Sequence, residues 1–311
     1  SAAVDLAPPA NAQGKIQEIY KPLIAIKQPT QSRRERRRIL KEAGFNPFRV
    51  SARDIPFNLI TDDSSGILDE DELAAMCNAS SIEAEYERFE RVWRDYFPQM
   101  QYVRLFARGG DAERILARAL LREPKTIVAG TVHIEPGSWH ILYQKGELTS
   151  VFKWYRTFKF NKIEEFAGNP DLAMLKDSLA TGKVAYVVVM LTNNEIVAQP
   201  VSVEALKAVR GLIDKYASGT PLILDAARIW SNAQLIRERD SARAHKSTKE
   251  IVNELVALAD GLVISAKKEI VANAGGILAF KDDAYVEKLL GSLKEEDRVG
   301  YDEVALFLDK A

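Results

Sequence analysis

The sequence predicts an α/β protein in which a mostly parallel sheet is covered by helices on both faces. Strand-length apolar runs lie at residues 184–191, 221–224 and 261–264, and helical patterns separate them. A capping box, Ser-Thr-Lys-Glu at 247–250, opens one of these helices. Because parallel strands need a crossover between them, the alternation indicates βαβ units, whose ligands bind at the carboxyl ends of the strands.

The remaining elements follow from local patterns. Residues 33–43 are rich in arginine and predict a short polar helix that Gly44 ends; the interspersed glutamates favour a solvated face over phosphate contacts. Residues 203–216 place apolar side chains at helical spacing on one face. Further helices are expected at 69–77, 82–96 and 111–121, and a further β-strand at 126–129.

Composition excludes several classes of protein. The 311 residues, 47% of them hydrophobic, suffice for one large or two ordinary domains. With 43 basic and 44 acidic side chains, nothing favours binding to nucleic acid or to an anionic membrane, and the apolar runs are too short to span a bilayer. The single cysteine, Cys77, rules out an internal disulfide and predicts a cytoplasmic location.

Two polar segments end neighbouring predicted strands. Asp225-Ala226-Ala227-Arg228 follows the run at 221–224, and Ser265-Ala266-Lys267-Lys268 follows the run at 261–264. This is the layout of a pyridoxal 5'-phosphate (PLP) enzyme, in which a lysine binds the cofactor aldehyde and a carboxylate keeps the pyridine nitrogen protonated. The two segments, 225–228 and 265–268, together predict a PLP site.

Between residues 36 and 283 the chain resembles the large domain of the aromatic amino-acid β-eliminating lyases, tyrosine phenol-lyase and tryptophanase. The matching segments keep their order and near-constant spacing at 41–46, 59–62, 89–91, 128–130, 199–202, 208–210, 225–228, 259–261, 265–268 and 275–276. The resemblance implies the fold of type I PLP-dependent transferases, with a mixed, mostly parallel sheet covered by helices.

The resemblance also assigns roles to individual residues. Lys268 matches the lysine that forms a Schiff base with PLP, and Asp225 the partner of the pyridinium nitrogen. Arg228 and Asn194 match contacts of the ring hydroxyl oxygen, and Ser265 matches a phosphate ligand. Each residue, taken singly, also has an ordinary interpretation. Lys268 could be a surface lysine, Asp225 a helix cap, Arg228 an ion-pair partner and Asn194 a turn former.

Two parts of the cofactor site depart from the family. Arg108-Gly109-Gly110 stands where the family has Gln-Gly-Arg, so backbone amides at a helix start are expected to hold the phosphate. Ile134 replaces the phenylalanine that stacks on the ring, with His133 beside it as an alternative stacking group or a structural histidine.

Other departures concern the reaction. Ser80 falls where the family has the tyrosine that protonates the leaving group, which argues against classical phenol or indole elimination. Asn78 replaces an acidic ligand of the family's monovalent cation, although Asn273 matches another member of that site. We therefore expect no metal among the site residues.

The resemblance divides the chain into an arm and short helix (1–46), a PLP-binding large domain (47–290) and a helix (291–311) leading towards a small domain. In the family that domain supplies an arginine for the substrate carboxylate, and here the sequence ends at Ala311. A split enzyme, a short natural homologue and an artificial truncation are the alternatives. We favour a split enzyme, because the cofactor set is intact, and expect a dimer-based heteromer with a second polypeptide.

The predicted function is that of a PLP-dependent lyase subunit that abstracts the α-proton of an amino acid, followed by β-elimination or β-replacement. A non-catalytic scaffold subunit paired with an active paralogue is the first alternative. A PLP enzyme that performs retro-aldol cleavage or decarboxylation is the second, supported by His133 alone.

Overall fold

The computed structural model describes residues 32–45, 49–50, 54, 81–121, 126–131, 135–151, 164–193, 198–270, 272 and 275–282. Two compact units share the chain: Ser1–Ile60 with Ile67–Ala79, and Thr61–Gly66 with Ser80–Ala311. Within the first unit, α1 (Arg33–Glu42) opens with a capping box between Ser32 and Glu35. Gly44 follows that helix at φ +63°, a conformation that glycine adopts without steric cost.

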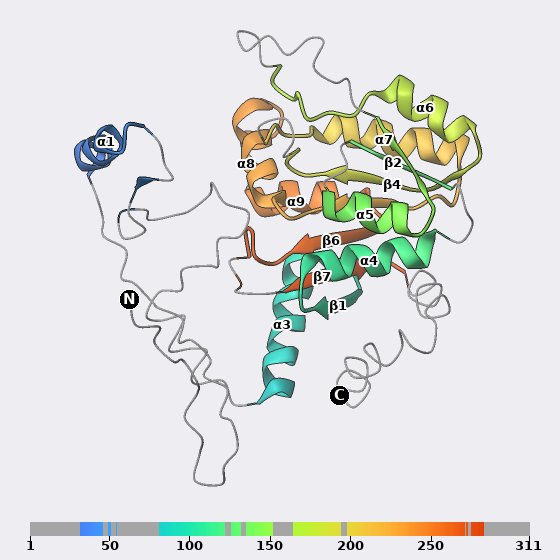
Figure 1. Cartoon of the computed structure of the whole chain (residues 1–311), viewed down its shortest axis with the longest axis horizontal. Coiled ribbons are helices and arrows are strands. Elements are labelled where there is room, and N and C mark those ends of the chain that lie inside the picture. The colour runs from blue at the N-terminus through green and yellow to red at the C-terminus, as the bar shows by residue number, and fades with distance from the viewer. Residues whose placement is uncertain are drawn as a thin grey trace, which may run out of the picture. The chain divides into compact units, whose positions relative to one another are not determined.

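The second unit is built on a seven-stranded sheet with the order β1-β7-β6-β5-β4-β2-β3. The central strands β2, β4, β5 and β6 run parallel with β3, whereas β7 is antiparallel to both β6 and β1 (Figure 1). The strand bounds are β1 (Tyr102–Phe106), β2 (Ile127–Gly130), β3 (Glu147–Ser150), β4 (Val184–Met190), β5 (Leu222–Asp225), β6 (Gly261–Ser265) and β7 (Gly276–Phe280).

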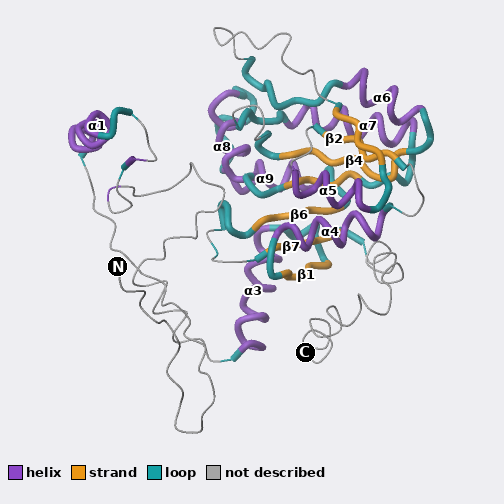
Figure 2. The backbone as a smooth tube through the Cα atoms, viewed as in Figure 1, coloured by secondary structure: helices purple, strands orange, loops and turns teal. Residues whose placement is uncertain are grey.

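Helices cover both faces of this sheet (Figure 2). The helix bounds are α3 (Ile82–Tyr96), α4 (Gly109–Leu120), α5 (Glu135–Tyr143), α6 (Leu172–Ala180), α7 (Val203–Tyr216), α8 (Ile229–Arg239) and α9 (Thr248–Ala257). None of the described helices is long and apolar enough to cross a membrane.

Side chains alternate between two hydrophobic cores along the strands. In β5, Leu222 and Leu224 join the core under α3, α6, α7, α8 and α9, whereas Ile223 joins the core under α4 and α5. Successive side chains of a strand point to opposite faces, so Asp225 belongs to the α4 and α5 face. Val263 lies in the same core as Ile223, and Ser265, two residues later, faces the same way.

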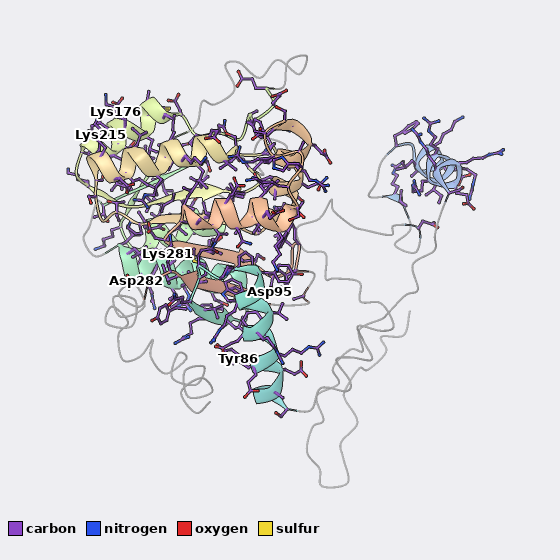
Figure 3. All side chains as sticks on the ribbon, turned by 180° about the vertical axis from the view of Figure 1, so that it is seen from behind. Tyr86, Asp95, Lys176, Lys215, Lys281 and Asp282 are labelled. Atoms are coloured by element: carbon purple, nitrogen blue, oxygen red, sulfur yellow. The ribbon has the colours of Figure 1, made fainter. Side chains whose placement is uncertain are left out.

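Polar contacts lie at the surface of the helices that cover the Leu222 and Leu224 core. Lys176 of α6 and Lys215 of α7, labelled in Figure 3, both place their ammonium groups over the Tyr216 ring, at 5.7 and 5.2 Å from its centroid. Asp95 of α3 accepts a 2.7 Å hydrogen bond from Lys249 of α9. The Lys176 contact joins α6 to α7 and the Lys249 contact joins α9 to α3, whereas the Lys215 contact lies within α7.

The structure confirms the expected α/β class. The helices expected at 82–96, 111–121, 203–216 and after Ser247 are α3, α4, α7 and α9, and the four expected strands are β2, β4, β5 and β6. The helix expected at 69–77 lies outside the described residues, as does Cys77. Helices α5, α6 and α8 and strands β1, β3 and β7 were not predicted.

Candidate cofactor site

The carboxyl ends of the parallel strands meet at one edge of the sheet. Met190 of β4 lies beside Asp225 of β5, which lies beside Val263 of β6. On the other side of β6, Ser265 is paired with Gly276, which is paired with Phe106 at the end of β1. The segments that follow β1, β4, β5 and β6 therefore emerge at the same edge.

Of two predicted site residues, Asp225 is the last residue of β5 and Arg228 lies in the segment that follows it. The Ala227 N–H donates a 3.2 Å hydrogen bond to Asp225 Oδ1, which fixes the carboxylate in an Asx turn. The N–H of Arg228 donates to the carbonyl of Leu191, at 3.0 Å, and so joins this turn to the end of β4. Asp225 is thus oriented by the turn and does not cap α8, whose N-cap residue is Arg228.

Ser265 is the last residue of β6, and Lys268 lies in the segment that follows it. The N–H of Lys268 donates to the carbonyl of Ser265 at 3.2 Å, so the lysine lies in a tight turn directly after the strand. The N–H of Ala266 donates to the carbonyl of Gly275 at 3.0 Å, which supports the turn from the side of β7. Lys268 is half-buried, as are Asp225 and Arg228.

The segment after β1 contains Arg108, Gly109 and Gly110, and α4 begins at Gly109. A Cβ on Gly109 would lie 2.8 Å from Ser265 Cβ and 3.2 Å from its Oγ, so only glycine fits there without displacement. The backbone amides at the start of α4 are therefore next to the Ser265 hydroxyl, a suitable donor set for a phosphate.

The side chain of Arg108 does not complete that donor set. It is 75% exposed and pairs with Asp111 at 3.2 Å. Gly110 carries no side chain, and a Cβ at this position would lie 3.9 Å from Nε2 of His140 on α5. The loop thus offers backbone amides, as the sequence predicts, and His140 is a neighbour that the sequence did not indicate.

Three predicted cofactor residues, Asn194, His133 and Ile134, lie outside the described residues. Asn193, however, is described: it follows β4 and is 0% exposed. Neither its amide nitrogen nor its amide oxygen has a hydrogen-bond partner among the described residues. A buried amide without partners is rare in native proteins, and a polar ligand is one way to satisfy it. The family resemblance pointed only to the next residue, Asn194, so the sequence did not indicate Asn193.

Glu113 is a second site residue that the sequence did not indicate. It lies on α4, one turn after Gly109, and its Oε2 is shielded from solvent without a hydrogen-bond partner among the described residues. Burial raises the pKa of Glu113 to about 8; the nearby Asp225 carboxylate raises it as well, whereas Lys268 lowers it. At neutral pH the glutamic acid therefore holds its proton beside Asp225 and Lys268.

We expect the titration of Glu113 to make stability depend on pH. Its folded-state pKa lies above its ordinary value of 4.5, so the folded state holds a proton that the unfolded state releases. The free energy of unfolding should then fall as pH rises from about 5 to about 8, by at most about 1.4 kcal/mol per pH unit. Urea unfolding of Glu113→Gln at pH 5, 6.5 and 8 should show a flatter dependence than the wild type.

The control for that experiment is Glu147→Gln, because Glu147 is an exposed glutamate on β3. This variant also loses one carboxylate and should keep the wild-type dependence. Parallel pH curves for the wild type and Glu113→Gln would contradict a raised pKa at Glu113.

The described residues fit PLP on three structural grounds. A helix start lies beside a serine hydroxyl, a carboxylate and a lysine end adjacent strands, and buried polar atoms of Asn193 and Glu113 lack partners among the described residues. Together they provide donors for a phosphate, an acceptor for a ring N–H and an amine for an aldehyde.

Comparison with known proteins gives the family. Residues 59–311 match the β-eliminating lyase family. The "probable tryptophanase" of Aeropyrum pernix is 35% identical to this chain over 274 residues, which cover 85% of the chain and 57% of the relative. Tryptophanase of Salinibacter ruber is 31% identical, with coverage of 84% and 56%. The chain thus spans little more than half the length of these curated relatives.

The solved structures include a "putative kynurenine aminotransferase" of Saccharomyces cerevisiae, with a TM-score of 0.50 and 12% identity. The likeness covers 70% of this chain and 51% of that one, and at this identity it concerns the fold alone. What the two proteins share is the fold, which in this chain is a seven-stranded, mostly parallel sheet. By its sequence match, this chain belongs to the β-eliminating lyase family.

Proposed function

We propose that the chain binds PLP at the carboxyl edge of the sheet and takes part in a lyase reaction on an amino acid. The observation that carries the proposal is that Asp225, Ser265, Lys268 and the Gly109 loop lie together at that edge. Bound PLP supplies a protonated pyridine ring that stabilises the negative charge developing at the substrate α-carbon.

Each residue of the chain has a definite task in this proposal. The Lys268 amine would hold the cofactor through its aldehyde and would accept the proton from the substrate α-carbon. The Asp225 carboxylate, held by the Ala227 N–H, accepts a hydrogen bond from the ring nitrogen and keeps it protonated.

The other groups hold the cofactor in place. The amides at the start of α4 and the Ser265 hydroxyl donate to the phosphate. Arg228 and the asparagine pair at 193–194 are the donors for the ring hydroxyl oxygen. The neutral Glu113 adds no second negative charge beside Asp225, whose carboxylate is the anion that we assign to the ring nitrogen.

For the reaction we propose β-elimination: a substrate that carries a leaving group on its β-carbon takes up water and yields the protonated leaving group, a keto acid and ammonia. The names of the relatives, tryptophanase and tyrosine phenol-lyase, support this choice. Because Ser80 stands where the family has the tyrosine acid, we propose leaving groups that need less assistance than phenol or indole.

The experiment that tests this proposal adds PLP to the purified chain and records the visible absorption before and after borohydride reduction. We expect an absorption band that reduction fixes, with the label on Lys268 in peptide maps. Amino acids with good β-leaving groups should then yield keto acid and ammonia in equal amounts. Glycine with an aldehyde would indicate retro-aldol cleavage instead, and carbon dioxide with an amine would indicate decarboxylation.

A non-catalytic scaffold subunit is the second candidate. The observation that favours it is the phosphate loop, where Arg108 is exposed and paired with Asp111 and where Gly110 has no side chain. A chain without arginine contacts to the phosphate would hold PLP weakly. A protein that stays colourless and unlabelled with added PLP would support this candidate and overturn the first.

We also propose that a second polypeptide supplies the arginine that the resemblance assigns to the substrate carboxylate. The support is that the proposed cofactor residues lie within residues 59–311, which match the family, whereas the chain covers only 57% and 56% of the length of two relatives. Native purification of the tagged chain should recover that polypeptide and raise turnover. Full turnover by the chain alone would contradict the proposal.

A further inference from the structure

Glu269 follows Lys268 directly and makes the side-chain contacts that join two segments of the site. Its Oε2 accepts a hydrogen bond from the N–H of Trp230 at 2.8 Å, and its Oε1 accepts one from the N–H of Ser231 at 2.9 Å. The Ser231 hydroxyl donates to Oε1 as well. One carboxylate therefore binds three donors of a segment that lies nearly forty residues earlier in the sequence.

These donors belong to the first turn of α8, the helix that follows Asp225 and Arg228. The first N–H groups of a helix have no partner within the helix, and a negative charge at that end is favourable. The N-cap residue, Arg228, makes no side-chain capping bond. Glu269 therefore takes the place of the usual N-cap side chain, but from the loop that carries Lys268.

The backbone alone does not make this connection. The pairing of β5 with β6 ends at Asp225 with Val263, and a last hydrogen bond runs from the N–H of Ala226 to the carbonyl of Val263, at 2.9 Å. Lys268 lies five residues beyond that point. The Glu269 carboxylate joins the lysine turn to the α8 segment beyond the end of the β5–β6 ladder.

The start of α8 is itself well fixed. The ring of Trp230 meets the ring of Tyr96 edge-on, with centroids 5.4 Å apart, and lies 6.2 Å from the ring of Phe97. The side chain of Asn232 accepts from the N–H of Val201 at 2.9 Å and donates to its carbonyl at 3.0 Å. Because Glu269 binds this helix end, the packing of α8 against the core also fixes the position of the lysine turn.

We propose that Glu269 is a positioning residue for Lys268: by binding the start of α8, it holds the lysine turn in a fixed place relative to Asp225 and Arg228. The inference rests on the proposed function, in which Lys268 binds the PLP aldehyde. Because its carboxylate is engaged by the start of α8, Glu269 acts through the lysine turn and not on the reacting atoms. It keeps the amine and the carboxylate, carried by two different strands, in one geometry.

The test compares Glu269→Ala and Glu269→Gln with Glu250→Ala. Glu250 closes the capping box of α9 by accepting from the Ser247 N–H at 2.8 Å, so its loss also removes a carboxylate from a helix start. Three quantities are measured in each variant: the thermal midpoint, the dissociation constant for PLP, and amide hydrogen exchange at residues 265–269.

We expect both alanine variants to lose similar thermal stability, because both lose a helix cap. Glu269→Ala alone should weaken PLP binding, by about tenfold or more, since it loses the charge-assisted hydrogen bonds between the lysine turn and the start of α8. It alone should speed amide exchange at residues 265–269. Glu269→Gln keeps one acceptor oxygen without the charge and should fall between the wild type and Glu269→Ala; it also provides a folded variant if the alanine variant does not fold.

Wild-type PLP affinity and wild-type exchange at 265–269 in the Glu269 variants would overturn the inference and leave Glu269 a helix cap only. A wild type that binds no PLP would instead overturn the proposed function. The exchange measurement needs no cofactor, so it decides in that case whether Glu269 holds the lysine turn.

Discussion

Replacement of Lys268 by alanine should abolish both the borohydride-stable attachment of PLP and all turnover of amino acids. The reason is chemical: the Lys268 amine is the group that we assign to bind the aldehyde and then to take the α-proton. The side chain is half-buried in a turn after β6 and does not belong to either hydrophobic core. The thermal midpoint should therefore stay close to that of the wild type.

Lys267→Ala is the matched control, because it removes a neighbouring lysine from the same turn. After reduction with borohydride, this variant should still carry the label on Lys268 in a peptide map. Turnover of any amino acid by folded Lys268→Ala would show that the lysine assignment is wrong.

Replacement of Asp225 by asparagine should leave PLP bound but slow α-proton removal by a factor on the order of 10² to 10³. Asparagine keeps an Oδ1 that can accept from the Ala227 N–H, so the turn after β5 should persist. A neutral amide, however, does not hold the ring nitrogen protonated, and the ring then withdraws charge less strongly.

Exchange of the substrate α-proton in deuterium oxide, followed by NMR, measures this step without requiring the later elimination. Asp177→Asn, at an exposed position on α6, controls for the loss of one negative charge. If Asp225→Asn exchanged the α-proton at the wild-type rate, Asp225 would have no part in the mechanism.

Strong local signals explain which elements could be predicted. The helix at Val203–Tyr216 has Leu206, Val209 and Ile213 on one face, and all three are fully buried. The capping box at 247–250 is formed as the pattern predicts. The strands β4, β5 and β6 are continuous apolar runs because the sheet is covered on both faces.

Weak local signals explain the elements that were missed. Strand β3, Glu147–Ser150, is short and has no fully buried residue, so its sequence carries no apolar run. Strand β7, Gly276–Phe280, is fully buried but begins at the second of two consecutive glycines, a pair that is typical of a turn. In α8 the apolar positions are few and polar residues separate them, so periodicity alone did not indicate that helix.

The sequence by itself determined the α/β class, the main capped helices and the order in which Asp225, Arg228, Ser265 and Lys268 follow their strands. These features depend on periodicity, capping and motif spacing, which are local. Only the tertiary structure decided that Ser265 packs on Gly109, that Glu113 holds its proton near Asp225, and that Glu269 binds the start of α8. Each of these depends on burial and on contacts between segments far apart in the chain, and no local pattern encodes them.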